Sequence, residues 1–154
     1  MKITSLVFVA LLLVSGCAIV PRISNSSVEV RSKAMEPSLK RGDKILISRD
    51  VEKLERGDIV IYHYPGDESQ SFIHRIIGLP EEEIEMRQGR VYINGRYLEE
   101  FYVSSINNTS SVNHELLKIP DGKYFVMGDN RDHSNDSRIW GTLSKEYIYG
   151  KYID

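Results

Sequence analysis

The sequence of 154 residues predicts an all-β fold, a compact barrel or sandwich of short, mostly antiparallel strands that follows an N-terminal apolar segment. Three observations predict this class. Short runs rich in β-branched and aromatic residues recur along the chain. Glycine–aspartate pairs and related turn signals separate these runs. No segment shows an amphipathic helical pattern longer than two turns, so the pattern favours strands over helices.

The expected strands follow one another closely. We expect them at residues 44–48, 58–64, 71–77, 83–87, 90–94, 96–98, 123–127 and 147–149. Asn94–Gly95 is a strong signal for a hairpin turn between two of these strands. Residues 103–115 are rich in serine and asparagine, and we expect them to form a polar surface loop.

Composition limits the function classes. Hydrophobic content of 41% and charged content of 27% are typical of a globular domain rather than of a disordered chain or a protein with many membrane spans. A net charge of −2 offers no basic surface for nucleic acid, so we expect no nucleic-acid partner. The single cysteine excludes an internal disulfide. The four histidines lack ligand spacing, and we expect neither a metal nor another cofactor.

The N-terminus indicates export. Lys2 precedes an uncharged, mostly apolar run over residues 3–20, a pattern typical of an export signal and close to the lower length for a membrane span. Residues 14–17 resemble a bacterial lipobox, in which Cys17 would be lipidated; the alternative is an uncleaved membrane anchor. We therefore predict a signal or anchor at residues 1–20, a linker at 21–27 and a β domain at 28–154.

Three segments of that domain carry the candidate chemistry. They are Ser32-Lys33-Ala34-Met35-Glu36-Pro37-Ser38-Leu39, residues 71–80 around His74-Arg75, and Gly128-Asp129-Asn130-Arg131-Asp132-His133-Ser134-Asn135-Asp136-Ser137-Arg138. Together they resemble signature segments of the type I signal peptidases, the S26 serine endopeptidases that remove leader peptides from exported proteins. The resemblance implies that family's fold and covers residues 28 to about 150.

The resemblance places the catalytic positions residue by residue. Ala34 stands where the family has its serine nucleophile, and Ser32 stands at an oxyanion-hole position. A methyl side chain cannot form an acyl-enzyme intermediate. His74 falls at the general-base position, where most bacterial members have lysine and the endoplasmic-reticulum and archaeal branch has histidine. By the same resemblance Ser134 and Asp136 support His74, and Arg75 and Arg138 hold Asp136.

We therefore expect a nucleophile-deficient, catalytically silent member of the family. It would bind or present an exported preprotein or another extended peptide without cleaving it, with surface-assembly proteins as further candidate partners. The N-terminus would insert into membrane lipid, with the domain on the extracytoplasmic face of the bacterial cytoplasmic membrane. The alternative is an active signal peptidase I with serine at position 34 and His74 as base, in which Ala34 is an engineered substitution.

Overall fold

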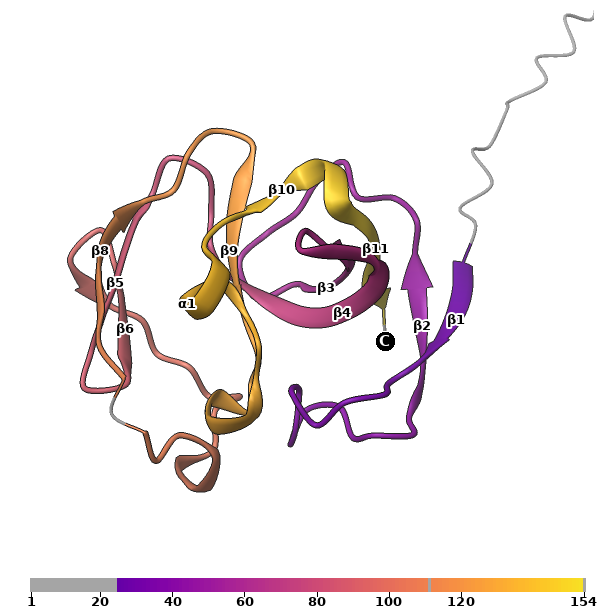
Figure 1. The fold of residues 1–154 in the computed structure, drawn as a ribbon, viewed down its shortest axis with the longest axis horizontal. Helices are drawn as coiled ribbons and strands as arrows, with labels where there is room; N and C mark the ends of the chain where they lie inside the picture. Colours follow the sequence, from indigo (N-terminus) through magenta and orange to yellow (C-terminus); the bar gives the residue numbers. More distant parts are fainter. Residues whose placement is uncertain (1–24, 111, 154) are drawn as a thin grey trace, which may run out of the picture.

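The computed structural model describes residues 25–110 and 112–153, and these residues form two packed antiparallel sheets (Figure 1). The expected export segment with Cys17 lies outside the described residues. Residues 25–27, expected in the linker, already belong to the first strand. No helix within the described ranges is long and apolar enough to cross a membrane.

The seven-stranded sheet has the order β1-β2-β11-β3-β4-β9-β10. Its strands are β1 Asn25–Glu29, β2 Lys44–Ser48, β3 Ile59–Tyr64, β4 Asp67–Gly78, β9 Lys123–Met127, β10 Leu143–Ser144 and β11 Ile148–Ile153. All the neighbouring pairs are antiparallel, as expected for strands joined by tight turns. The sheet coils strongly, and β4 curves across its centre in Figure 1.

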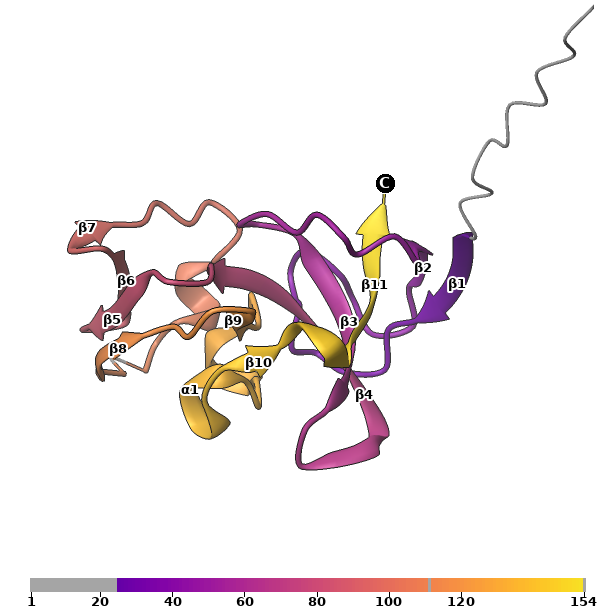
Figure 2. The same ribbon diagram turned by 90° about the horizontal axis from the view of Figure 1, so that it is seen from above.

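The four-stranded sheet has the order β7-β6-β5-β8 and lies to one side of the first sheet in both views (Figure 2). Its strands are β5 Glu83–Arg87, β6 Arg90–Ile93, β7 Arg96–Tyr97 and β8 His114–Lys118. Asn94 and Gly95 both have positive φ, the conformation that the predicted hairpin turn between β6 and β7 requires.

The helices are single turns. They are η1 Ser105–Asn107, η2 Arg131–His133, α1 Ser137–Trp140 and η3 Lys145–Tyr147. The α1 helix begins at Asp136, whose carboxylate accepts the main-chain N–H of Arg138 as an N-cap. The expected lack of longer helices in this domain is thus confirmed for the described residues.

Alternating strand residues make three adjoining clusters of buried side chains. One fills the space between the two sheets, where Ile84 and Met86 of the small sheet meet Ile77, Phe125 and other residues of the large one. The other two lie on either side of the large sheet, around Tyr62 and around Ile47. The predicted all-β fold of short, mostly antiparallel strands is therefore confirmed.

Three strands were not expected from the sequence. They are β1, β8 and β10. The loop predicted over residues 103–115 ends in β8, where most side chains are exposed and the period-two pattern is weak. Pairing of β8 with β5 supplies the order that its side chains do not signal.

Candidate active site

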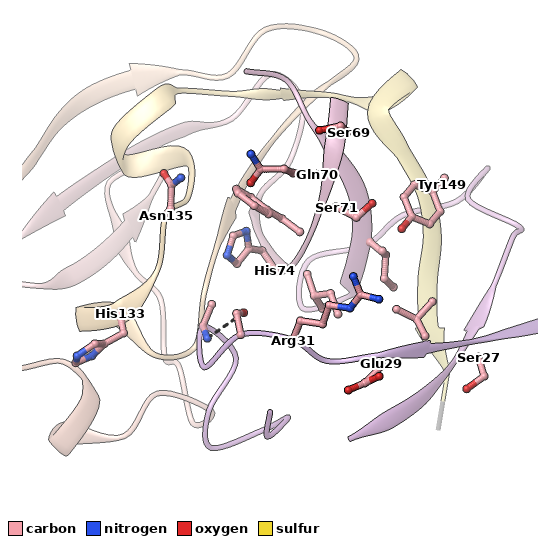
Figure 3. Close-up of a pocket in the computed structure, with 16 residues that line it drawn as sticks. Ser27, Glu29, Arg31, Ser69, Gln70, Ser71, His74, His133, Asn135 and Tyr149 are labelled. Atoms are coloured by element: carbon pink, nitrogen blue, oxygen red, sulfur yellow. Dashed lines mark hydrogen bonds between the residues drawn. The ribbon is translucent and has the colours of Figure 1, made fainter. Parts of the chain in front are cut away.

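A cleft of about 810 Å³ runs between the segment that follows β1 and the first half of β4 (Figure 3). Ser27, Glu29 and Arg31 lie along one wall, and Ser69, Gln70 and Ser71 lie along the other. Ala34 and His74 both line this cleft, although 40 residues separate them in the sequence. The cleft is lined by Ser27, Val28, Glu29, Arg31, Ser32, Ala34, Ile61, Ser69, Gln70, Ser71, Phe72, Ile73, His74, His133, Asn135 and Tyr149.

One edge of β4 is unpaired along the cleft. β9 pairs with β4 only from Arg75 onward. The N–H of Ile76 donates to Asp58 and its carbonyl accepts from Gly57, on the β3 side. Because main-chain groups alternate along an antiparallel strand, those of Ile73 and Ser71 point away from β3. Within the described ranges they meet no third segment, so this edge can accept an extended peptide.

Main-chain contacts hold Ala34 firmly. Met35 beside it is 1% exposed and anchors the turn in the core. The carbonyl of Ala34 accepts the N–H of Asn130 at 2.9 Å. The N–H of Ala34 donates to the Ser32 hydroxyl at 3.4 Å, so Ser32 is adjacent to position 34 as the resemblance implies.

Gly128 allows two of the three signature segments, those of Ala34 and Ser134, to approach each other closely. A Cβ atom built at Gly128 would lie 2.4 Å from the Ser134 hydroxyl and 2.5 Å from the Ala34 carbonyl oxygen. Real atoms do not approach so closely, and both obstacles belong to packed segments. Only glycine at this position lets the segments of Ala34 and Ser134 lie on either side of β9's C-terminal end.

His74 lies at the centre of the site and is 2% exposed. Its Nε2 is 3.0 Å from the Ser134 hydroxyl, and its Nδ1 is 2.7 Å from the Tyr62 hydroxyl. Burial lowers the pKa of His74 to about 4, against an opposing effect of the Asp136 charge. The imidazole is therefore neutral at pH 7, as a general base must be.

The carboxylate of Asp136 is fully buried, and both of its oxygens accept hydrogen bonds. It accepts two hydrogen bonds from the Arg138 guanidinium at 2.8 Å and one from the N–H of Gly128 at 3.0 Å. Burial raises the pKa of Asp136, but Arg138, His74 and the Gly128 N–H together outweigh burial, and the net shift of the pKa is downward. Asp136 acts on His74 through space only, because no hydrogen bond joins them in the structure.

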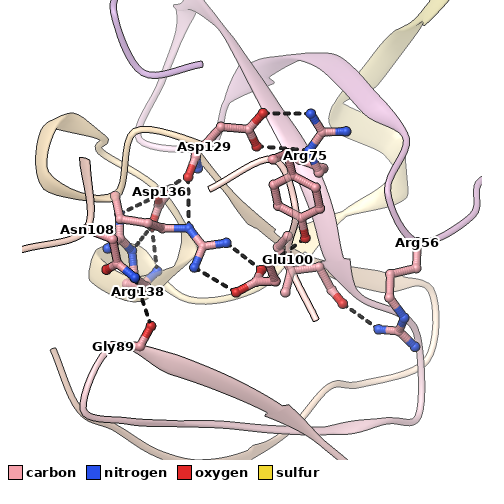
Figure 4. Close-up of polar contacts among 12 residues, drawn as sticks. Arg56, Arg75, Gly89, Glu100, Asn108, Asp129, Asp136 and Arg138 are labelled. Carbon is pink, nitrogen blue, oxygen red and sulfur yellow. Dashed lines mark hydrogen bonds and ion pairs between the residues drawn. The ribbon is translucent and has the colours of Figure 1, made fainter. Parts of the chain in front are cut away.

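The expectation that Arg75 holds Asp136 is wrong. Arg75 instead makes a bidentate pair with Asp129, at 2.6 and 2.9 Å, and donates to the Gly57 carbonyl (Figure 4). In Figure 4 this pair and the Asp136–Arg138 pair are separate. Each of the two arginines therefore has its own aspartate, because the signature segment of residues 128–138 turns through η2 between Asp129 and Asp136.

Two further contacts join the segment of residues 128–138 to the loop that follows β7. Arg131 forms an ion pair with Glu100, and both side chains are buried. Asp132 accepts the N–H groups of Thr109 and Ser110 at 2.9 and 3.0 Å.

Sequence reasoning missed three partners in the site, namely Tyr62, Asp129 and Glu100. Tyr62 could have been found from the β3–β4 hairpin. Val60 pairs with His74, and Tyr62 lies on the same face of β3 as Val60, so Tyr62 is a diagonal neighbour of His74.

A metal site has no support in the described part of the chain, where no group of three or more His, Cys, Asp or Glu side chains is placed to bind an ion.

A cleft lined by His74, whose imidazole is 3.0 Å from the Ser134 hydroxyl, is an arrangement typical of a serine-type peptidase scaffold. Comparison with known families makes this specific. Residues 1–153 match the family described as signal peptidase, peptidase S26, and the chain belongs to that family. The resemblance seen in the three signature segments is thereby confirmed.

Individual relatives agree with this assignment. The chain is 37% identical over 131 residues to a probable signal peptidase I-2 of Synechocystis sp., covering 79% of this chain and 58% of that protein. It is 29% identical over 140 residues to signal peptidase IB of Staphylococcus aureus, covering 79% and 72%. A crystal structure of a signal peptidase I from Enterococcus faecalis V583 superposes with a TM-score of 0.57 at 34% identity, covering 66% of this chain and 98% of the other.

Asp136→Asn should destabilise the domain by about 3–5 kcal/mol, because it leaves the Arg138 guanidinium without its counter-ion inside the protein. Denaturant unfolding followed by circular dichroism measures this. The control is Glu55→Gln, which breaks the exposed Lys53–Glu55 pair and should cost less than about 1 kcal/mol. Equal effects of the two changes would contradict a structural role for the Asp136–Arg138 pair.

The lowered pKa of His74 predicts acid sensitivity. Below pH 6.5 the unfolded chain binds a proton at His74, whereas the folded chain does so only near pH 4, so stability falls as the pH falls through this window. Between pH 7 and pH 5 the loss from this residue should be about 1–2 kcal/mol. His74→Gln should remove that part of the pH dependence, and His133→Gln, at an exposed histidine, should retain it. An unchanged slope in His74→Gln would refute the assignment.

Proposed function

We propose that this protein is a catalytically silent signal peptidase homologue that binds an extended segment of an exported precursor without cleaving it. Family membership supports the substrate class, since the relatives described above are signal peptidases I. The chain spans 58% of the length of the Synechocystis relative.

The observation that carries the proposal is the methyl group of Ala34 at the wall of a cleft whose other polar contacts are in place. The cleft, the His74–Ser134 contact and the Asp136–Arg138 pair are all in place. Attack on a peptide carbonyl needs a nucleophilic atom within about 3–3.5 Å of it. Ala34 offers none, and its main chain is fixed by the Asn130 contact. Binding is therefore retained where bond cleavage is lost.

We propose strand addition as the binding mode. The free edge of β4 presents the main-chain groups of Ser71 and Ile73 to the cleft, and a peptide can continue the sheet there. Main-chain hydrogen bonds of this kind give affinity with little dependence on side chains. The floor at Ile61 and Tyr149 provides the apolar surface beneath the bound segment.

Membrane tethering completes the proposal. Its support is the sequence pattern of Lys2 followed by the apolar run over residues 3–20, with Cys17 as the candidate lipidation site. The domain would then stand on the extracytoplasmic face of the membrane, where exported precursors pass. Precursors of surface-assembled proteins are one class of partner that such a holding role would suit.

The principal test is binding without turnover. The unaltered full chain should bind a leader peptide with small residues at −1 and −3, and mass spectrometry should find the peptide intact afterwards. Ser71→Pro removes one cleft-facing N–H without altering the β3 ladder, so the affinity should fall roughly 2- to 10-fold. Ser71→Ala keeps that N–H and is the matched control; its affinity should be unchanged.

Thermal melts of both Ser71 variants check that the fold is intact. Equal affinities of the two variants would contradict strand addition, and cleavage of the peptide by the unaltered chain would contradict the silent role.

The 3.0 Å contact of His74 with Ser134 favours a second candidate function, an active peptidase in which Ala34 is an engineered substitution. The two candidates differ in what a serine at position 34 achieves. If the site is that of an active enzyme, Ala34→Ser alone should give rapid, site-specific cleavage of the leader peptide, measured by mass spectrometry over time. Little or no cleavage by Ala34→Ser would favour the silent homologue.

A further inference from the structure

The hydrogen bond between Tyr62 and His74 has a direction that matters for the base position. The two atoms are 2.7 Å apart, and both side chains are buried. A neutral imidazole carries one N–H and one bare nitrogen, so only one of its two nitrogens can accept a proton from a nucleophile. Which nitrogen is bare is decided by the partners of each, and these partners are fixed by the fold.

The partners available to the Tyr62 hydroxyl assign the direction of this hydrogen bond. The Tyr62 side chain is 0% exposed, and its hydroxyl has no partner in the described ranges other than Nδ1 of His74. A buried hydroxyl whose proton finds no acceptor is costly. The Tyr62 hydroxyl therefore donates its proton to Nδ1, which must be bare. The only proton of the neutral imidazole is then on Nε2, and it is donated to the Ser134 hydroxyl.

Packing prevents Tyr62 from turning away. Its ring lies against Phe72, Trp140 and the imidazole itself, with ring centroids 6.1, 6.1 and 5.9 Å apart. Burial also raises the pKa of the Tyr62 phenol, so it remains protonated and a hydrogen-bond donor at neutral pH. The phenol is thus a permanent, fixed donor to Nδ1.

A histidine that serves as general base needs the opposite arrangement. An acceptor, usually a carboxylate, takes the Nδ1 proton and leaves Nε2 bare toward the nucleophile. The buried carboxylates of the region do not do this: Asp136 is bound to Arg138, Asp129 to Arg75 and Glu100 to Arg131, and none of them is hydrogen-bonded to His74. The place next to Nδ1 is occupied by a donor instead.

We infer that Tyr62 is a positioning residue that holds His74 as the Nε2–H tautomer, so that the base position of this chain is blocked independently of the missing nucleophile. This deepens the proposed silent function and rests on it: the site would lack both an attacking oxygen and an available base. Moving the proton to Nδ1 would leave the Tyr62 hydroxyl buried without an acceptor, which disfavours the productive tautomer by roughly 10- to 100-fold.

The direct test is nitrogen NMR of the full chain labelled with ¹⁵N-histidine. With four histidines in the sequence, the His74 signals can be assigned by replacing the other three one at a time. At pH 7 we expect an unprotonated Nδ1 and a protonated Nε2 for His74. Tyr62→Phe should shift His74 toward a mixture of tautomers, because neither form then has a partner at Nδ1. A protonated Nδ1 with a bare Nε2 in the unaltered chain would overturn the inference.

The kinetic test uses a serine at position 34 as the reporter. With a leader peptide, Ala34→Ser combined with Tyr62→Phe should cleave at least about 10-fold faster at saturation than Ala34→Ser alone, with little change in KM. The matched control adds Tyr64→Phe to Ala34→Ser. Tyr64 stacks on Phe72 in the same aromatic group, and its hydroxyl makes no hydrogen bond within the described ranges, so the rate should equal that of Ala34→Ser.

The outcomes of these experiments test the His74 tautomer separately from the proposed function. Equal rates for Ala34→Ser with and without Tyr62→Phe would overturn the inference. If none of the serine variants cleaves, the NMR result on the unaltered chain decides alone. A failure of the leader peptide to bind would refute the proposed function and leave the tautomer assignment standing, because the assignment depends only on contacts inside the protein.

Discussion

The site depends on one steric constraint, the missing side chain of Gly128. Its N–H donates to Asp136 and its carbonyl accepts from Arg131, so the residue is tied to both ends of the turn that follows β9. The Ala34 carbonyl and the Ser134 hydroxyl occupy the space that a Cβ would need. Because the interior is close-packed, no small shift of one segment can restore this arrangement once it is lost. The close approach of the Ala34 and Ser134 segments at Gly128 determines the cleft wall, the position of Ser134 and the N-cap of α1.

The polar groups around the site have a structural role that does not depend on peptide cleavage. The ion pairs Arg75–Asp129, Arg131–Glu100 and Arg138–Asp136 are all largely buried. Removing one partner of such a pair leaves an uncompensated charge inside the protein, which costs several kcal/mol. These residues are therefore needed for the fold whether or not the cleft cleaves peptides. Position 34 is different, because its hydrogen bonds are made by its main chain and not by its side chain.

Electrostatics and hydrogen-bond polarity together determine the state of His74. Burial keeps the ring neutral, and a neutral ring could accept a proton. The partner at Nδ1 then decides which nitrogen is bare. A phenol and a carboxylate at this position would give similar distances and opposite proton placements. A catalytic assignment based on residue types and distances alone would miss this difference, because both arrangements contain the same histidine and serine.

The sequence by itself determined the all-β class, the family and most strands, because short-range patterns carry that information. The strands at residues 44–48, 83–87 and 123–127 were predicted to the residue, since apolar and β-branched positions there match the burial of each face. The same is true of position 34, where the lack of a hydroxyl is a property of the residue itself.

Only the tertiary structure decided the pairings that join distant segments. Arg75 takes Asp129 rather than Asp136, Tyr62 meets His74, and the mostly exposed β8 becomes a strand by pairing with β5. The first and the third depend on geometry that arises after the sheets have closed, so no local pattern signals them, whereas the second depends on the register of the β3–β4 hairpin.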